Sequence, residues 1–303
     1  MKSSIHRRLM HTTRVLRHEN PLGLPQKGTI PRFQRGLPQK RPIKGVSHII
    51  AVSSAKGGVG KSTIAANLSL SFARLGLRTG ILDTDIFGPS IPTLFNLTGE
   101  GHTAQLSPAN QLLPLTNYGV KTMSLGYLQA DESAPVVWRG PMLLKVIQQL
   151  LHDVDWGSPG LDLLVLDLPP GTGDIQLSIA QQVPVDGAVV VTTPHVLAIK
   201  DAVKGVGMFG KVGVPVLGLV QNMSLFRCPH CAGETAVFGG EERVKQMCEE
   251  RGLELLGDVP LHPNIGEDGS RGKPTVAAEP ESERARVFMD VARRLAGKVG
   301  LEV

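Results

Sequence analysis

Cysteine is scarce in this chain, which has 303 residues and only Cys228, Cys231 and Cys248 as cysteines. So few cysteines exclude a scaffold held together by disulfide bonds and favour a reducing compartment. The sequence also lacks internal repeats and any run of about 18 apolar residues, the length that a membrane-spanning helix needs. We therefore expect a globular protein without an integral membrane segment.

Acidic residues are almost absent from the first 45 residues, where Glu19 is the one acid beside eleven lysines and arginines. This segment also lacks the continuous apolar stretch of a secretory signal. An arginine-rich, acid-poor N-terminus with Ser and Thr is typical of a mitochondrial transit peptide. A basic tail that binds RNA or anionic lipid is the alternative. We predict a targeting leader and linker over residues 1–45 and localisation in the mitochondrial matrix.

The remaining residues, 46–303, carry more acidic than basic side chains. The sequence pI of about 9.2 therefore reflects the leader and says nothing about the folded domain. Net charge is an argument about non-specific partners only where it belongs to the folded surface. A nucleic-acid partner inferred from this pI would be an error, and we expect no nucleic acid among the partners.

Apolar runs alternate with helical patterns through this domain. Strand candidates are residues 48–54, 79–83, 161–168, 187–193, 214–223 and 255–259, with a shorter pair at 113–115 and 120–125. Helix candidates are residues 64–75, 139–155, 201–211, 241–251 and 281–295. Several strands are continuous apolar runs, as expected for a parallel sheet covered on both faces. The alternation predicts an α/β domain with a doubly wound, mostly parallel sheet.

Residues 53–63 read Ser-Ser-Ala-Lys-Gly-Gly-Val-Gly-Lys-Ser-Thr, between a predicted strand and a predicted helix. This order is the context of a phosphate-binding loop, although the usual pattern has glycine where this chain has Ala55. Glycines let backbone N–H groups turn toward a phosphate at the helix N-terminus. Lys61 is expected to bind the β- and γ-phosphates of ATP, and Ser62 to bind Mg²⁺. The loop residues expected to bind the nucleotide are Lys56, Gly57, Gly58, Val59, Gly60, Lys61, Ser62 and Thr63.

The second lysine of this loop, Lys56, marks a deviant Walker A motif. The loop resembles that of MinD, ParA and the nitrogenase iron protein. The resemblance implies a P-loop NTPase of that type, in which the extra lysine reaches the nucleotide across a dimer interface. It therefore implies a nucleotide-dependent homodimer in which Lys56 and Lys61 both act in catalysis.

Acidic residues follow two of the predicted strands, at the sheet edge where open α/β folds bind ligands. Asp83 and Asp85 alternate along an extended segment, so we expect their side chains to face different ways. Asp167 ends a buried strand, as in a Walker B motif, and is expected to hold Mg²⁺. The segment 169–173, Pro-Pro-Gly-Thr-Gly, is expected to become ordered around a γ-phosphate.

Two further roles come from the resemblance alone. It implies that Asp85 orients the attacking water and is the third catalytic residue. It also implies that Asn222, at the end of the predicted strand 214–223, reads the edge of the adenine base.

The pair Cys228-Pro-His-Cys231 lies in a predicted metal-binding insertion over residues 224–238. A dithiol redox centre needs its first cysteine at a helix N-terminus, and the glycine-rich residues that follow are poor helix formers. Zinc and iron–sulfur sites usually take four ligands, and this pair supplies two. Cys248 is expected to pack as a small buried hydrophobe. The same pair in a second subunit would complete the site, and two structural thiols remain the alternative.

The order of these motifs resembles the Mrp family of iron–sulfur carrier ATPases over roughly residues 40–296. The motifs are the phosphate loop, Asp-x-Asp-x-Phe-Gly-Pro-Ser, Pro-Pro-Gly-Thr-Gly-Asp, Gln-Asn-Met-Ser and Cys-Pro-x-Cys. The resemblance implies a labile [4Fe–4S] cluster that bridges two chains through Cys228 and Cys231, and a slow ATPase that delivers it to apo-proteins. Together with the basic leader, it implies the mitochondrial branch, which serves the assembly of respiratory complex I.

Two other functions stay open. One is a positioning ATPase of the MinD and ParA type, which acts on a membrane or on DNA. An amphipathic basic helix at the end of the chain favours it, although such a helix more often closes a core. The apolar positions on one face of that helix are Val287, Phe288, Val291, Ala292 and Leu295. The other is a nucleotide-dependent scaffold bridged by zinc, which suits a tetrahedron of four cysteines equally well.

Overall fold

Nine strands form one sheet in the residues that the computed structural model describes, which are 40–99, 101–128, 140–228, 230–240 and 242–303. Most of the predicted leader lies outside these residues. The strands run in the spatial order β3-β4-β2-β5-β1-β6-β7-β8, and β9 also pairs with β7. They are β1 (Val46–Ser53), β2 (Thr79–Asp83), β3 (Leu115–Asn117), β4 (Val120–Ser124), β5 (Leu161–Asp167), β6 (Gly187–Thr192), β7 (Val216–Arg227), β8 (Glu234–Thr235) and β9 (Leu255–Leu261).

The centre of the sheet is parallel and buried. Strand β1 pairs in parallel with β5 and with β6, and every residue of β6 is buried. Antiparallel pairing joins β3 to β4 and β8 to β7, at the two margins. Valine, isoleucine and leucine fill the central strands because both of their faces meet helices and neither meets water. The parallel strands therefore present their carboxyl ends along one edge.

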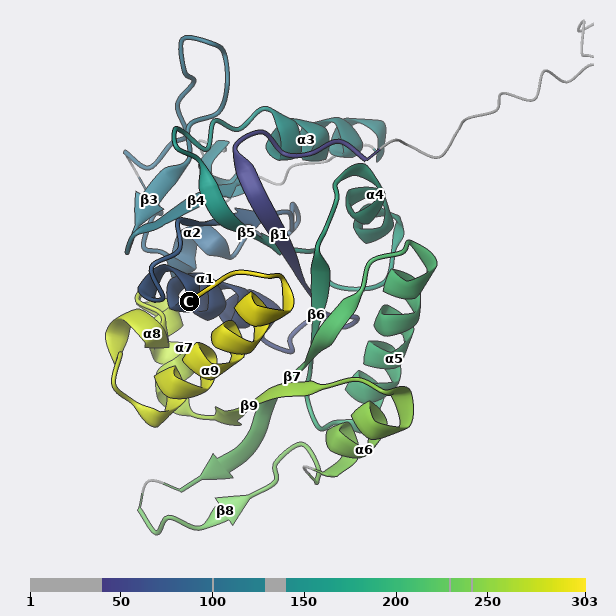
Figure 1. The fold of residues 1–303 in the computed structure, drawn as a ribbon. Helices are drawn as coiled ribbons and strands as arrows, with labels where there is room; N and C mark the ends of the chain where they lie inside the picture. The colour runs from purple at the N-terminus through teal and green to yellow at the C-terminus, as the bar shows by residue number, and fades with distance from the viewer. Residues whose placement is uncertain (1–39, 100, 129–139, 229, 241) are drawn as a thin grey trace, which may run out of the picture. The chain divides into compact units, whose positions relative to one another are not determined.

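Helices cover both faces of this sheet (Figure 1). Helix α1 packs against α9 on one face, and α5 packs against β6 and α6 on the other. This arrangement is the doubly wound fold that the alternation of strands and helices predicts. The helices are α1 (Lys61–Arg74), α2 (Ile91–Leu94), α3 (Gly140–His152), α4 (Asp174–Gln182), α5 (Val196–Lys211), α6 (Glu242–Arg251), α7 (Pro263–Ser270), α8 (Thr275–Ala278) and α9 (Glu283–Lys298), with a 3-10 turn, η1, at Leu125–Leu128.

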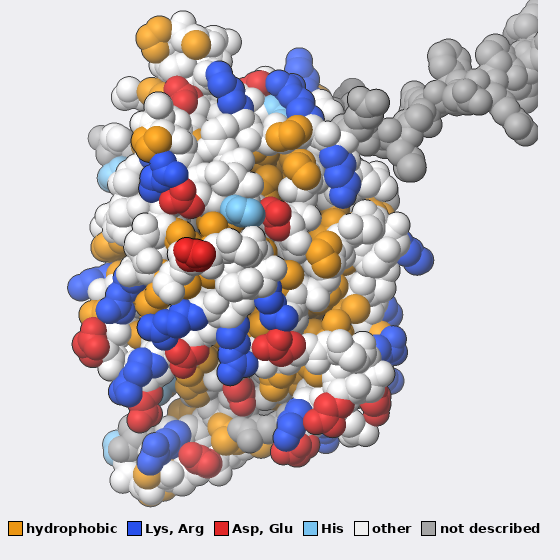
Figure 2. Space-filling view, in the orientation of Figure 1, with side chains coloured by type: hydrophobic (Ala, Val, Ile, Leu, Met, Phe, Trp, Pro, Cys, Tyr) orange, Lys and Arg blue, Asp and Glu red, His pale blue; other side chains and the backbone are white. Residues whose placement is uncertain are grey.

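The last helix, α9, closes the core. Its apolar residues Phe288, Val291 and Leu295 are buried, and the helix packs on α1 and β9. Figure 2 shows acidic and basic side chains mixed over the outer surface of this region. On α9, Arg294 and Lys298 pair with Glu254 at 3.6 and 2.8 Å. The apolar face that would dock on a membrane is thus already covered by the protein's own core.

The predicted fold class is confirmed, and the differences lie in boundaries and short elements. Strand β7 continues beyond residue 223 to Arg227, and α5 begins at Val196 instead of Asp201. The sequence patterns did not predict α2, α4, α7, α8 or β8. Four of these five span two to eight residues, and α2 and α7 contain proline, so they give no periodic pattern. No helix in the described part of the chain is long and apolar enough to span a bilayer.

Candidate functional site

The segment between β1 and α1 is a tight loop that only glycine permits at two points. Gly58 and Gly60 have φ of +78° and +84°, a region that side chains disfavour. At Gly60 a Cβ atom would also lie 2.2 Å from Nδ2 of Asn222, so no side chain fits there. Gly60 is the N-cap of α1, and no side chain caps this helix end. The N–H groups at the start of α1 are therefore available to an anion.

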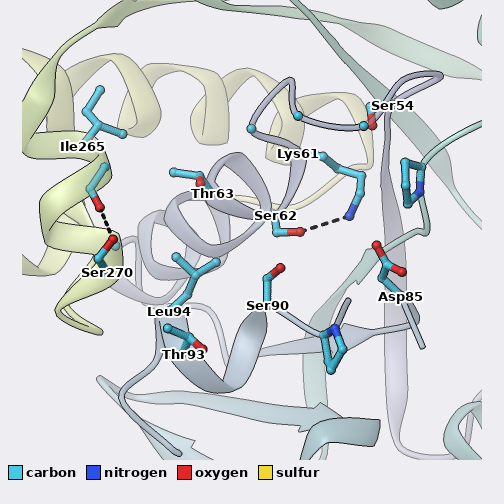
Figure 3. A pocket seen from close by; sticks show the side chains of 17 residues that line it. Ser54, Lys61, Ser62, Thr63, Asp85, Ser90, Thr93, Leu94, Ile265 and Ser270 are labelled. Carbon is cyan, nitrogen blue, oxygen red and sulfur yellow. Dashed lines mark hydrogen bonds between the residues drawn. The ribbon is translucent and has the colours of Figure 1, made fainter. Parts of the chain in front are cut away.

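A cavity of about 480 Å³ opens in front of this loop (Figure 3). Its size lies within the range of pockets that hold small ligands. Lys61 and Ser62 project into it from α1, and Asp85 faces them from the other side. The remaining lining comes from the loop, the segment after β2, Pro170 and one side of α7. Residues from four distant parts of the chain thus meet at the carboxyl edge of the sheet.

Lys61 forms a buried ion pair with Asp167 at the bottom of this cavity. Lys61 Nζ donates to Asp167 Oδ1 and also to Ser62 Oγ at 3.1 Å. The exposed fractions are 6% for Lys61 and 0% for Asp167. The second carboxylate oxygen, Oδ2, is buried and has no hydrogen-bond partner among the described residues. A hydroxyl beside an unpartnered carboxylate oxygen fits a hard cation such as Mg²⁺, held directly or through water.

Asp83 and Asp85 face different ways, as their alternation predicts. Asp83 is buried and accepts hydrogen bonds from the N–H groups of Asp85, Ser90 and Ile91 and from Ser124 Oγ. Burial and the nearby Asp167 raise the pKa of Asp83 to about 7, while Lys61 opposes this shift. Asp83 therefore anchors the start of α2. Asp85 lines the cavity, and partial burial raises the pKa of its carboxyl.

The segment after β5 is tied to the phosphate loop at two points. Gly171 N–H donates to the carbonyl of Ser54 at 2.9 Å. The side chain of Gln176 donates to the carbonyl of Pro169 and accepts from Ser53 Oγ at 3.4 Å. Gln176 is 1% exposed. It lies on α4, which the sequence patterns did not predict. The sequence signal for its role was a polar residue within a short apolar stretch.

Ala55, the departure from the usual loop pattern, packs against α5. A Cβ atom built on Gly205 of that helix would lie 3.6 Å from Ala55 Cβ. The methyl group of Ala55 therefore lies beside Gly205, where α5 has no side chain. The next residue, Lys56, is exposed and lies outside the cavity lining. It is close enough to Asp201 to help Lys204 lower the pKa of that carboxyl.

Asn222 holds the back of the phosphate loop. Its side chain is 6% exposed and donates to the carbonyl of Val59 at 2.8 Å. A second, more apolar cavity of about 440 Å³ lies beside it, bordered by Gly60, Thr63 and the start of α7. The role of Asn222 in adenine binding stays a prediction, and the structure adds a contact within the protein that the sequence did not reveal.

Cys228 and Cys231 lie in the turn of the β7–β8 hairpin, which extends past the rest of the sheet (Figure 1). Cys228 N–H donates to Gly233 O, and Ala232 N–H donates to Cys228 O, each at 2.9 Å. Hydrogen bonds from the backbone of Cys231 and His230 lower the pKa of the Cys228 thiol. Cys231 is exposed. Backbone donors that stabilise a thiolate in an open turn suit a metal ligand.

The described part of the chain places no third metal ligand with the two thiols. Among the described residues, no group of three or more His, Cys, Asp or Glu side chains is placed to hold a metal. Cys248 is buried on α6, as expected, and burial raises the pKa of its thiol. The hairpin also differs from a redox dithiol, because no helix begins at Cys228. The described part of one chain thus offers two thiols at this turn and no third ligand.

The fold and the phosphate-binding cavity define a P-loop NTPase. Residues 45–296 match the family described as ParA: NUBPL iron-transfer P-loop NTPase, and the chain belongs to this family. The "Iron-sulfur cluster transfer protein NUBPL" of Mus musculus is 50% identical over 86% of this chain and 80% of its own length. The "Iron-sulfur cluster carrier protein" of Escherichia coli K12 is 49% identical over 85% of this chain and 68% of its own length. These findings confirm the resemblance to iron–sulfur carrier ATPases, and iron–sulfur cluster transfer is the function at the level of the family.

Solved structures agree with this assignment. A nucleotide-binding protein of Archaeoglobus fulgidus, in complex with ADP, superposes with a TM-score of 0.66 at 33% identity, covering 80% of this chain and 93% of its own. MinD of Pyrococcus horikoshii, in complex with Mg-ADP, has a TM-score of 0.62 at 22% identity, covering 84% and 98%. The second likeness shows the fold alone, and it confirms the predicted MinD and ParA type of architecture.

Proposed function

We propose that this protein is an ATP-dependent carrier that holds a [4Fe–4S] cluster between two subunits and delivers it to apo-proteins. The observation that carries the proposal is the open hairpin with two thiols, in the same chain as a complete phosphate-binding cavity. A [4Fe–4S] cluster takes four thiolates, and each chain supplies Cys228 and Cys231. A two-fold axis sets the same surface of two copies against each other and so brings four thiolates together.

In the nucleotide site, the phosphates are bound by the N–H groups of Gly57, Gly58 and Gly60 and by the N-terminus of α1. Lys61 is placed to bind the β- and γ-phosphates, and Asp167 and Ser62 would hold Mg²⁺, which would neutralise charge on the phosphates. Asp85 orients the attacking water, and Lys56 reaches the nucleotide of the partner subunit. The exposed position of Lys56, outside its own cavity, supports this role in trans. We expect slow hydrolysis, because many such switches await a partner.

The cargo is expected to be labile. The thiols lie in an exposed turn at the margin of the sheet, where a client thiolate can approach the cluster. Ligand exchange from an exposed site is easier than from a buried one, since no core has to open. We propose the mitochondrial matrix as the location and complex I subunits among the clients, on the strength of the basic leader and of the resemblance to the mitochondrial branch of the family.

Anaerobic reconstitution with iron and sulfide tests the proposal. We expect about four irons per dimer, the stoichiometry of one [4Fe–4S] cluster, with the absorbance and Mössbauer spectra of that cluster. Cys248→Ser is the matched control and should keep the cluster, because Cys248 is buried away from the pair. A full cluster on a monomer would contradict the bridging, and stable zinc in place of iron would favour the zinc-bridged scaffold.

Targeting is tested separately. Residues 1–45 fused to a fluorescent reporter should carry it into the matrix, and deletion of residues 1–35 should leave a folded protein in the cytosol. Full-length protein that stays cytosolic and uncleaved would contradict the predicted leader. This test does not depend on the cluster, so the two parts of the proposal can fail independently.

A further inference from the structure

Strand β7 connects the phosphate loop to the cysteine pair. Asn222, in the middle of this strand, donates its side-chain N–H to Val59 O of the loop. Cys228 directly follows Arg227, the last residue of the strand. A single short stretch of backbone therefore links a side chain that holds the nucleotide loop with the first thiol of the proposed cluster site.

This stretch is irregular between the two points. Met223 has φ of +54°, a left-handed conformation that is strained for a residue with a long side chain. The pairing with β9 also shifts here, from Asn222 opposite Val259 to Phe226 opposite Leu261. Between these two pairs, β7 contains more residues than β9, so β7 carries a β-bulge here. Bulges next to functional sites commonly re-aim the side chains that follow them.

The bulge contacts the phosphate loop directly. The site of a Cβ atom on Gly60 lies 2.2 Å from Asn222 Nδ2 and 3.8 Å from Met223 Cε. Gly60 is the N-cap of α1, where the phosphates are expected to bind. A change in the loop at Gly60 therefore displaces Asn222 or Met223, because no free space separates them.

The residues of β7 that follow the bulge pair with β8 to form the hairpin. Phe226 pairs with Thr235 and Arg227 with Glu234, immediately before the cysteine turn. Any change in the length of chain stored in the bulge shifts these pairs and moves Cys228 relative to the sheet. Ser224 Oγ, which donates to Val259 O at 3.2 Å, fastens the present arrangement to β9.

We propose that the bulge at Asn222 and Met223 couples the nucleotide state of the phosphate loop to the geometry of Cys228 and Cys231. The inference rests on the proposed function and adds a regulatory route to it. The strained residue and the surplus chain form an element with two arrangements, and ATP and ADP favour different ones. Because coupling between sites is reciprocal, loading the cysteines also changes nucleotide affinity by the same factor.

Thiol alkylation of the full-length, metal-free protein tests this route. Iodoacetamide modification of Cys228 and Cys231 is followed by mass spectrometry, at saturating Mg-ADP and at saturating Mg²⁺ with a non-hydrolysable ATP analogue. The buried Cys248 is the internal reference. We expect the rate at the pair to differ by at least about fivefold between the two nucleotides, the lower end of typical coupling.

Two variants then interrupt the route. Met223→Gly removes the strain and the side chain whose Cε lies 3.8 Å from the Cβ site of Gly60, and Asn222→Ala removes the bond to Val59. In each, the difference between nucleotides should fall below about twofold, under the range of typical coupling. Saturating nucleotide ensures that weaker binding does not imitate lost coupling. Asn110→Gly is the matched control, since Asn110 has φ of +59° in a turn outside both sites. It should keep the full difference.

Equal alkylation rates in the parent protein overturn the inference, and so do Met223→Gly and Asn222→Ala proteins that keep the full difference. The proposed function fails on other evidence, namely absence of a cluster after reconstitution. Alkylation is read without iron, so a protein that fails reconstitution and still shows the nucleotide-dependent rates supports the coupling alone.

Discussion

The phosphate loop and the cysteine hairpin each follow a strand of one sheet, yet they are built in opposite ways. Lys61 and Asp167 are buried, paired with each other and surrounded by residues from four parts of the chain. Cys228 and Cys231 lie in an open turn held by a few backbone hydrogen bonds. The nucleotide cavity thus draws its lining from one chain, whereas the hairpin presents two thiols and no third ligand among the described residues. Loss of a group should therefore affect the two sites very differently.

The sharpest test of this contrast is removal of one thiol. Cys228→Ser or Cys231→Ser should lower cluster occupancy by more than about 100-fold, beyond what loss of an outer-shell partner costs. Nucleotide affinity and melting temperature should change little, because the turn is exposed and contributes little packing. Iron analysis, calorimetric nucleotide titration and thermal melting check the three expectations. A large fall in melting temperature would show that the hairpin is a structural element.

Removal of Lys61 should impair nucleotide use and stability instead of cluster binding. Lys61→Ala is expected to reduce ATP turnover by about 10²- to 10³-fold, as for other groups that stabilise transition-state charge. It also leaves Asp167 as an unpaired buried carboxylate, which costs about 3–5 kcal/mol in typical proteins. Thermal melting without nucleotide and a steady-state phosphate assay measure the two effects.

Lys56→Ala is the matching experiment on the exposed lysine of the same loop. Stability should stay within about 0.5 kcal/mol of the parent, as for most surface substitutions. Nucleotide binding should be weakened less than in Lys61→Ala, and the main losses should be hydrolysis and ATP-dependent dimer rearrangement. Equal and complete loss of binding in both variants would contradict separate roles for the two lysines.

A smaller effect is expected for Gln176, which fixes the segment after β5 to the base of the phosphate loop. Gln176→Met keeps the volume but removes the bonds to Pro169 and Ser53. We expect kcat to fall by about tenfold with a smaller change in KM, because misplacement of a neighbouring segment reduces turnover. Gln181→Met on the same helix is the control. Equal kinetics for the two variants would mean that Gln176 only fills space.

The smallest expected effect is a titration in the nucleotide site. The folded pKa of Asp83 is raised to about 7, so below this pH the folded protein holds a proton that the unfolded chain releases near its ordinary value. The stability due to Asp83 therefore falls as pH rises from about 4 to about 7. In the absence of nucleotide, the melting temperature of the parent should therefore fall relative to that of Asp83→Asn as the pH rises through this range. A constant difference would contradict the titration.

Patterns in the sequence predicted the sheet and the strand–loop–helix context of the glycine-rich loop well. The apolar runs of β1, β5 and β6 reflect burial on both faces, which is a property of each strand by itself. The glycine-rich loop predicts its own backbone conformation, since Gly58 and Gly60 adopt the positive φ that the loop requires. Such local signals survive in a single sequence.

Contacts between distant segments were not predictable in the same way. The sequence predicted that Asp83 and Asp85 face different ways, but it did not reveal that Asp83 anchors the start of α2. The adenine contact expected of Asn222 stays a prediction, and the sequence did not reveal its hydrogen bond to the carbonyl of Val59. The bond from Gln176 to Pro169 depends on α4, a helix too short and too mixed in composition to show a clear period. These roles arise from packing of segments far apart in the chain, which no local pattern records.

The packing of Ala55 on Gly205 has a consequence for how this protein can change over time. The Cβ of Ala55 and the site of a Cβ on Gly205 are 3.6 Å apart, so two small residues share one fixed volume. A larger side chain at either position would push α5 away from the phosphate loop. Positions 55 and 205 should therefore vary as a pair among descendants of this sequence, with bulk permitted at one only when the other is glycine. The loop can therefore carry alanine at position 55, where glycine is usual, because the facing residue of α5, Gly205, is glycine.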